Sequence, residues 1–535
     1  MGHVPSRPLP LRAPECCLCF NLVLLILTVA VVSFNTACGG GGMSSGPPPL
    51  SGVTQVTVAM SSTANDQLLD FDMVLNSLTL TSQSGKTVTL FSTPQGFEFT
   101  HLNGQLAPGF TVTVPQDIYI SATATVGGAE FACVTYIPDY GLTSAYYAYG
   151  YTPDSDVTVN LASPMTITGS NMGLAINLQV LQSATLPGNC WDQGAAWSIN
   201  PTFDLIPFAL SSQPTNPKNG KVLALDGEIT AISGNNFTLA VAEADATADN
   251  VTISTANDTV YQGIGSFSAL TVGAFVDMDG ALQSDSSVLA TRIAVEYAFA
   301  IDVVIGPITS VAASEPALSI LGRDQQGSDF ADSYLIGGQF FSFDSAIFQV
   351  SGQLTNLQNL PFVPSFTGSN MVAGQNVYLS SPALSDSSNP YTELDAITLI
   401  PQTINGTVTG SSVSGNFTDY SVSLASYSLF PNLAVQPGQT TLLNNPSDVE
   451  VYVDSNTQLL NSQPLGEGGS FRFYGLVFND NGTLRMDCAQ VNDGVGGTPQ
   501  TSRLRRSYLQ KGEAAIRRTG KGPLQQTVTV IRRQP

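Results

Sequence analysis

Three short motifs that begin with glycine recur along the second half of the chain, and this repetition constrains the fold more than any other feature. The motifs are Gly227–Thr230 (Gly-Glu-Ile-Thr), Gly306–Thr309 (Gly-Pro-Ile-Thr) and Gly406–Thr409 (Gly-Thr-Val-Thr). Landmarks that return every 80 to 100 residues or so indicate successive copies of one structural unit. The sequence therefore predicts three diverged units, at residues 221–297, 298–400 and 401–492.

A second set of landmarks supports the same division. Leu270–Asp277 has a partner in Met371–Tyr378, and the hairpin-like segment 279–293 has one in 474–488. The middle unit carries a long insertion between its landmarks, and the third lacks the Leu-x-Val-Gly element. The sequence leaves open whether these two units close as barrels.

The composition favours strands over helices. Charged residues make up 11% of the chain, less than half of the roughly 25% that is typical of soluble domains, so the helix-forming residues Lys, Arg and Glu are scarce. Apolar and polar residues alternate over Val53–Met60, a pattern typical of a half-buried strand. We therefore predict an all-β chain with a first domain at 53–210 and a linker at 211–220.

The first repeated unit resembles a known family through Gly227–Thr230, Leu270–Gly273 and Leu289–Ile293. The family is the bacterial domain of unknown function 5666, a small OB-like β-barrel that is often found in tandem in lipoproteins. The resemblance weakens through residues 300–400 and 402–492.

The first domain is similar, over Pro164–Leu178, to an exported β-sandwich-like family, the domain of unknown function 4382. The two resemblances together imply a β-sandwich-like domain followed by about three small OB-like β-barrel repeats. Neither family brings an established catalytic residue to this chain.

The amino-terminal segment looks like an export signal. Basic residues precede a run of 13 mostly apolar residues, Leu22–Phe34, which suits a signal peptide better than a membrane span. Asn35-Thr-Ala-Cys38 then resembles a lipoprotein cleavage site, although Asn35 stands where leucine is usual. We predict a signal peptide at 1–37, a lipid on Cys38 and a flexible tether at 38–52. A plain secretory signal or an uncleaved anchor is the alternative.

The resemblance to lipoproteins also implies a location. Two acyl chains on the cysteine would hold the protein stably at a membrane, and Gly39 after the anchor implies the outer membrane or cell surface of a bacterium. The predicted partners are the membrane, through this lipid, and a polysaccharide or another envelope component.

Three cysteines besides the anchor remain in the predicted mature chain. Cys133 and Cys190 both fall in the first domain, and an oxidising compartment would allow them to form a disulfide. Cys488 would then be unpaired, and we expect it in a buried strand.

Charge is distributed very unevenly. Residues 39–500 contain seven basic residues against 38 acidic ones, a net charge of about −31. Such a body would repel phosphate backbones, so we expect no nucleic-acid partner. Half of the 18 basic residues follow position 500, and we expect residues 493–535 to form a disordered tail that lies on anionic lipid or folds back on the body.

Catalytic motifs are hard to find. His101 is the single histidine of the predicted mature chain, and a lone histidine in a turn is usually a surface or packing residue. We therefore expect no metal, no cofactor and a non-catalytic protein. The alternative is a carbohydrate-active hydrolase, which needs only a pair of carboxylates.

A tyrosine-rich segment at 136–151 is the predicted contact surface. Its candidate residues are Tyr140, Tyr146, Tyr147, Tyr149 and Tyr151. Tyrosines can present a rigid binding surface that stacks on sugars. They can equally cover the core of the domain, and the sequence favours neither reading.

Overall fold

The computed structural model describes most of residues 50–494. The gaps are residues 64–67, 138–141, 149–154, 160, 162, 186–197, 243–249, 300, 313–315, 327–339, 355–356, 382–390, 426–427 and 435–442. The chain from Ser51 onward forms one compact unit. Within the described residues no helix is long and apolar enough to cross a membrane. The predicted signal peptide, Cys38 and the basic tail from residue 495 onward lie outside the described residues. Asp493, the predicted first residue of the disordered tail, is instead the last residue of the final strand.

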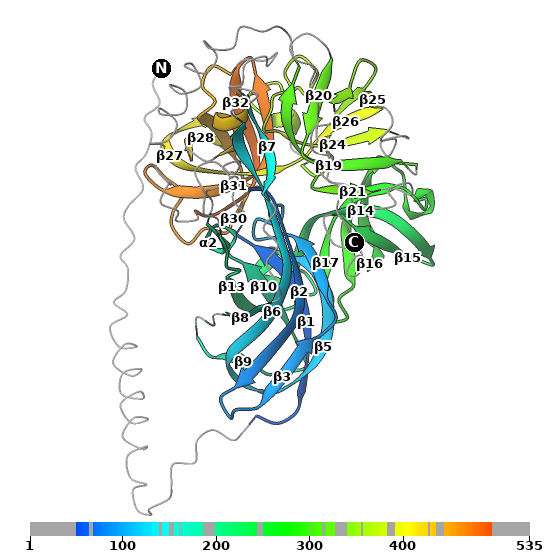
Figure 1. Cartoon of the computed structure of the whole chain (residues 1–535). Coiled ribbons are helices and arrows are strands. Elements are labelled where there is room, and N and C mark those ends of the chain that lie inside the picture. The colour runs from blue at the N-terminus through cyan, green and yellow to red at the C-terminus, as the bar shows by residue number, and fades with distance from the viewer. Residues whose placement is uncertain are drawn as a thin grey trace, which may run out of the picture. The chain divides into compact units, whose positions relative to one another are not determined.

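The fold is almost entirely β, which confirms the predicted class (Figure 1). The first domain, called the sandwich domain below, has two main sheets, ordered β13-β10-β1-β5 and β3-β2-β6-β7, with β4, β8 and β9 attached to the second. Its elements are β1 Val53–Ser62, β2 Leu68–Ser82, β3 Thr87–Phe91, β4 Gln95–Glu98, β5 Ala107–Pro115, β6 Asp117–Ile137, β7 Leu142–Ala148, β8 Ser155–Val159, β9 Met165–Ile167, β10 Asn171–Leu178, α2 Val180–Ser183, β11 Ala184–Thr185, β12 Ser198–Ile199 and β13 Phe203–Phe208. Val58, Phe71 and Phe131 belong to one core that joins both sheets.

The first repeated unit is a closed five-stranded barrel, called the first barrel. Its strands run β14-β15-β16-β18-β17 around the ring, and β16 pairs with β18 in parallel. The elements are η1 Pro217–Asn219, β14 Lys221–Ser233, β15 Asn236–Val241, β16 Asn250–Gln262, η2 Phe267–Ala269, β17 Phe275–Leu282 and β18 Val288–Tyr297. Alternate residues such as Val276 and Met278 point into its core, because successive side chains of a strand face opposite sides.

The third unit, called the third barrel, closes in the same order. Its ring runs β27-β28-β29-β32-β31, and the parallel pairing of β29 with β32 completes it. The elements are β27 Gln402–Ser414, β28 Phe417–Leu424, α3 Leu429–Leu433, β29 Asp448–Val453, β30 Gln458–Leu459, β31 Ser470–Asp480 and β32 Thr483–Asp493. Barrel closure, which the sequence left open for this unit, is therefore present.

The middle unit is also a β-sheet unit, but its strands are shorter and more numerous than those of the two barrels. Its elements are β19 Asp302–Val311, β20 Ala317–Ile320, β21 Asp324–Gln326, β22 Phe340–Ser342, β23 Ile347–Val350, η3 Leu357–Asn359, β24 Asn376–Ser381, β25 Tyr391–Glu393 and β26 Ala396–Leu399. The sheet runs β23-β26-β24-β19-β20-β22-β25. Between β25 and β26, Leu394 donates a backbone hydrogen bond to Ser342 and Asp395 donates one to Ser380, so these two residues connect β22 with β24.

At Gly227 and Gly306 the backbone of the neighbouring segment comes too close for any side chain. A Cβ at Gly227 would lie 1.9 Å from the carbonyl oxygen of Ala240, and one at Gly306 would lie 1.8 Å from that of Leu321. No side chain fits at such distances. The neighbouring strand can therefore approach only where glycine stands.

A second glycine has the same place in all three units. The backbone N–H groups of Gly273, Gly374 and Gly468 donate to the carbonyl oxygens of Ile229, Ile308 and Val408, each at 2.8 Å. All three glycines have positive φ angles, between 81° and 101°, which glycine adopts at little cost. The third barrel, which lacks the Leu-x-Val-Gly element in sequence, thus places Gly468 at the equivalent point.

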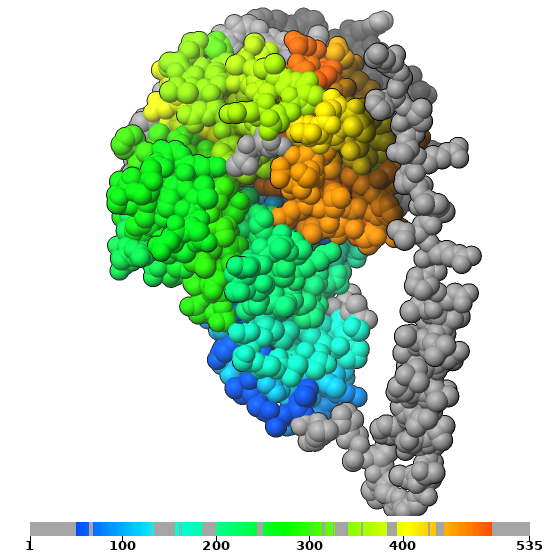
Figure 2. Space-filling model, turned by 180° about the vertical axis from the view of Figure 1, so that it is seen from behind, coloured from blue at the N-terminus to red at the C-terminus, as the bar shows by residue number. Residues whose placement is uncertain are grey.

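The middle unit and the third barrel lie side by side (Figure 2) and share one buried apolar cluster. Phe362 packs edge-on against Phe478 with 5.8 Å between ring centroids. The buried amide of Gln375 donates to the carbonyl oxygen of Val477 at 2.9 Å. Apolar packing and a satisfied polar contact together fix this interface.

Candidate functional site

The loop between β4 and β5, residues 99–106, contacts the third barrel and is called the hub loop below. Asn103 is fully buried at its tip. Its side-chain oxygen accepts a hydrogen bond from Arg472 at 2.9 Å, and its carbonyl oxygen accepts from Gln490 at 3.1 Å and Asn492 at 3.2 Å. One loop residue thus joins the sandwich domain to two strands of the third barrel.

Glu98 holds the base of the hub loop. Its carboxylate accepts hydrogen bonds from the backbone N–H groups of Phe71, Thr100 and His101, and it lies 2.9 Å from Nδ1 of His101. Burial alone would raise the pKa of Glu98, but the hydrogen bond and charge of His101, with the charge of Arg323, lower it to about 2. Glu98 is therefore an ionised structural anchor at neutral pH and is unsuited to act as a general acid.

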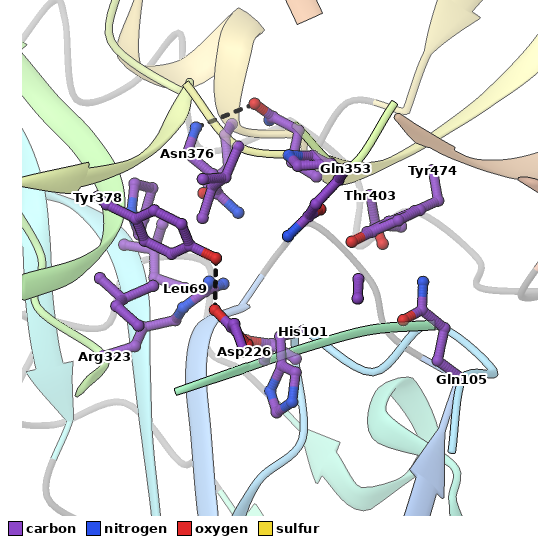
Figure 3. A pocket seen from close by; sticks show the side chains of 18 of the residues that line it. Leu69, His101, Gln105, Asp226, Arg323, Gln353, Asn376, Tyr378, Thr403 and Tyr474 are labelled. Atoms are coloured by element: carbon purple, nitrogen blue, oxygen red, sulfur yellow. Dashed lines mark hydrogen bonds between the residues drawn. The ribbon is translucent and has the colours of Figure 1, made fainter. Parts of the chain in front are cut away.

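A cavity beside the hub loop is called the hub cavity below. It is lined by residues of all four modules of the chain, which are the sandwich domain, the first barrel, the middle unit and the third barrel (Figure 3). Gln105 comes from the hub loop, Asp226 from β14 of the first barrel, and Gln353 from the turn after β23 of the middle unit. Thr403 of β27 and Tyr474 of β31 belong to the third barrel. Figure 3 shows the side chains of Gln105, Gln353 and Tyr474 directed toward the open space.

One wall of the cavity is a buried contact between the first barrel and the middle unit. The hydroxyl of Tyr378 donates to the Asp226 carboxylate at 2.5 Å, and its ring packs edge-on against Phe275. Burial and the nearby charge of Asp226 raise the pKa of Tyr378 well above its usual value. Tyr378 therefore stays protonated and acts as a hydrogen-bond donor.

A buried ionic network of the first barrel lies against the middle unit. Arg292 of β18 forms ion pairs with Asp277 and Asp279 of β17. Nearby, Glu296 accepts hydrogen bonds from the Ser351 hydroxyl at 2.9 Å and the Gly352 N–H at 3.0 Å, across to the middle unit. Burial would lower the pKa of Arg292, but the two aspartates outweigh it and raise the pKa. The hydrogen bonds of Glu296 thus join the first barrel to the middle unit.

These contacts determine what the cavity can do. His101 is matched by Glu98, and Asp226 by Tyr378, so these charged groups have partners inside the protein. Arg323 also lines the cavity, and its charge acts on Glu98. The other polar groups are amides and hydroxyls, which bind neutral polar molecules. Within the described residues no group of three or more His, Cys, Asp or Glu side chains is arranged to hold a metal ion.

The residues singled out from sequence fall mostly outside this cavity. Cys190, Tyr140, Tyr149 and Tyr151 lie outside the described residues. Cys133 pairs with Tyr146 through the backbone of β6 and β7, and Tyr147 follows on β7. The predicted disulfide and the predicted tyrosine surface stay predictions.

Two other sequence expectations have a clear structural outcome. Cys488 is a buried free thiol in β32, as predicted, and burial raises its pKa. His101, expected to be a surface or packing residue, is partly buried at the edge of the cavity and paired with Glu98. Sequence reasoning missed Glu98, Asn103 and Gln105, because single polar residues at a strand end or in a loop carry no periodic signal.

Comparison with known families supports one of the two resemblances. The model of a family described as a domain of unknown function (DUF5666) matches residues 226–294, which lie within the first barrel. No curated protein matches the chain. The family match thus covers most of the first barrel, and the description of the family assigns no function.

Proposed function

We propose that this chain is an exported bacterial lipoprotein whose β-rich body is a non-catalytic binding or envelope-structural module. The observation that carries the proposal is the cavity at the hub loop. The sandwich domain, the middle unit and the third barrel contribute neutral polar groups to it, and His101 and Asp226 in its lining have partners within the protein. Such an arrangement suits binding and rigid presentation better than proton transfer.

The sequence supports a membrane anchor at Cys38. A positively charged start, a short apolar run and small residues before the cysteine suit lipid attachment, and the four glycines after it suit a flexible tether. We propose the outer membrane or cell surface as the location. We propose a polysaccharide or another envelope component as partner, and the acidic body argues against nucleic acid.

Metabolic labelling tests the anchor. Labelled palmitate should enter the wild-type protein and a Cys19→Ala variant, because Cys19 lies in the segment that we expect to be removed. A Cys38→Ala variant should take up none. Equal labelling of the Cys38→Ala variant would contradict the anchor.

A polysaccharide screen tests the non-catalytic role. We expect full-length protein to bind members of a broad panel of envelope and plant polysaccharides without releasing reducing ends. Steady release of reducing ends by purified protein would contradict the proposal.

A second candidate is a carbohydrate-active hydrolase that uses paired carboxylates. Its support is Asp487 on β32, because burial together with the charge of Asp454 raises the pKa of Asp487 to about 7. A glycosidase needs a protonated acid of this kind beside a second carboxylate. Loss of turnover in Asp487→Asn, with normal turnover in the exposed-site variant Asp285→Asn, would establish this candidate.

A further inference from the structure

Three polar atoms in the wall of the hub cavity have no hydrogen-bond partner among the described residues. They are the amide nitrogen of Gln105, the amide oxygen of Gln353 and the hydroxyl of Thr403. Gln105 is buried, with an exposed fraction of 5% for the whole residue. Leaving such a buried group without a partner costs about 1–3 kcal/mol, so these groups point to a molecule that binds between them.

The charges around the cavity indicate a neutral ligand. His101 contacts Glu98 at 2.9 Å, and Asp226 accepts a hydrogen bond from Tyr378. Arg323 lies close enough to Glu98 to lower the pKa of that carboxyl. A charged ligand would find its opposite charge already compensated, and it would lose its hydration on entry.

The unpartnered atoms also determine the chemistry of the ligand. Gln105 offers a donor, Gln353 offers an acceptor, and Thr403 can act as either. A hydroxyl group can accept from the first and donate to the second. A molecule with several hydroxyls on adjacent carbons would satisfy all three, and its C–H faces would contact the apolar walls formed by Leu69, Ile305 and Pro401.

The size of the cavity limits the ligand. It offers about 50 Å³ to the centres of water-sized molecules, and one water needs about 10–15 Å³ by this measure, so about three to five such positions fit. This is enough for a triol, or for one hydroxylated edge of a sugar whose remainder extends into the mouth.

We propose that the hub cavity binds a small neutral polyol, either free or as the terminal sugar of a glycan. This inference rests on the binding role proposed above and names the class of ligand. Because all four modules line the cavity, the bound polyol would contact each of them and would stabilise the assembled body by mass action.

Ligand-observed nuclear magnetic resonance on the full-length chain tests the proposal. The probes are glycerol, glucose and methyl glucoside, each titrated against wild type, Gln105→Leu, Gln353→Leu and Gln213→Leu. Gln213 lies in an exposed segment outside the cavity, so its variant is the matched control. We expect saturable binding to wild type and to the control, and binding about tenfold weaker in each cavity variant, as the loss of one hydrogen bond of about 1.4 kcal/mol predicts.

Each result has a definite meaning. Binding of glycerol points to a free polyol, and preference for glucose or methyl glucoside points to a glycan terminus. No saturable binding of any probe, or equal binding by wild type and by folded Gln353→Leu, would overturn the proposal. If Gln105→Leu fails to fold, the partly exposed Gln353 provides the test by itself. Palmitate labelling of Cys38 is independent of this outcome, so the failure of the ligand proposal and that of the anchor are distinguishable.

Discussion

The first and third barrels close in the same strand order, yet their outward-facing residues differ. In each barrel the first glycine pairs with a core residue, Val276 or Phe471. The next residue faces outward and is Asp277 in the first barrel but Arg472 in the third. Asp277 pairs with Arg292, whereas Arg472 reaches the hub loop. The glycine positions are thus shared by the two barrels, whereas the outward position serves an ion pair within the first barrel and a contact to the hub loop in the third.

The largest expected effect tests whether closure depends on glycine in both barrels. A Cβ at Gly227 would lie 1.9 Å from the Ala240 oxygen, and one at Gly475 would lie 2.0 Å from the Asp487 oxygen. We expect Gly227→Ala and Gly475→Ala each to lower the free energy of unfolding by at least about 4 kcal/mol. Gly410→Ala, where no atom lies within 4 Å of the added Cβ, should change it little. Urea unfolding measures all three, and a mild effect at Gly227 or Gly475 would refute shared closure.

The next effect concerns the outward positions. Arg292→Met leaves the fully buried Asp277 without its cation, which we expect to cost about 3–4 kcal/mol of unfolding free energy. Arg472→Met should cost less, about 1–2 kcal/mol, because it removes hydrogen bonds to Asn103 and to the Asp493 carbonyl oxygen. Burial also lowers the pKa of Arg472 to about 10, so the charge itself is unfavourable there. Urea unfolding measures both variants. Equal losses of unfolding free energy in Arg292→Met and Arg472→Met would contradict this difference between the two barrels.

The pH dependence of stability tests the hub loop, which lies next to both barrels. The pKa of Glu98 is lowered from 4.5 to about 2 in the folded protein. Its stabilisation is therefore fully present above pH 4.5 and is lost as the pH falls toward 2, by about 3 kcal/mol in total. Glu98→Gln should be less stable than wild type at pH 7, and the difference should shrink with acid. Thermal unfolding between pH 2 and 7 measures this, and a constant difference would argue against an ionised Glu98.

The smallest effect concerns the contact between the first barrel and the middle unit. Tyr378→Phe removes the hydrogen bond to Asp226 and keeps the packing against Phe275. We expect a loss of about 1 kcal/mol in the free energy of unfolding. A control, Tyr420→Phe, changes a partly buried tyrosine of β28, and it should have a smaller effect. A loss above about 3 kcal/mol for Tyr378→Phe would contradict this expectation, because it would show that the hydrogen bond also stabilises structure beyond the contact between Tyr378 and Asp226.

The fold was largely predictable from sequence, whereas the candidate site was not. Alternation over Val53–Met60 and the recurring glycines are local signals, and they indicate strands and repeated units directly. The interrupted strands of the middle unit carry no such signal. Asn103 bonds to Arg472, which lies 369 positions later. Polar residues that act through such distant partners leave no pattern in a single sequence.

Hydrogen exchange on wild type and Arg472→Met tests the central claim, that the four modules depend on one hub loop. Arg472 joins the third barrel to Asn103, and Gln105, two residues further on, lines the shared cavity. Exchange follows local opening of structure. We predict that Arg472→Met speeds exchange in the hub loop, in β14 of the first barrel and around Gln353 of the middle unit, as well as in β31. Faster exchange confined to the third barrel would contradict the claim.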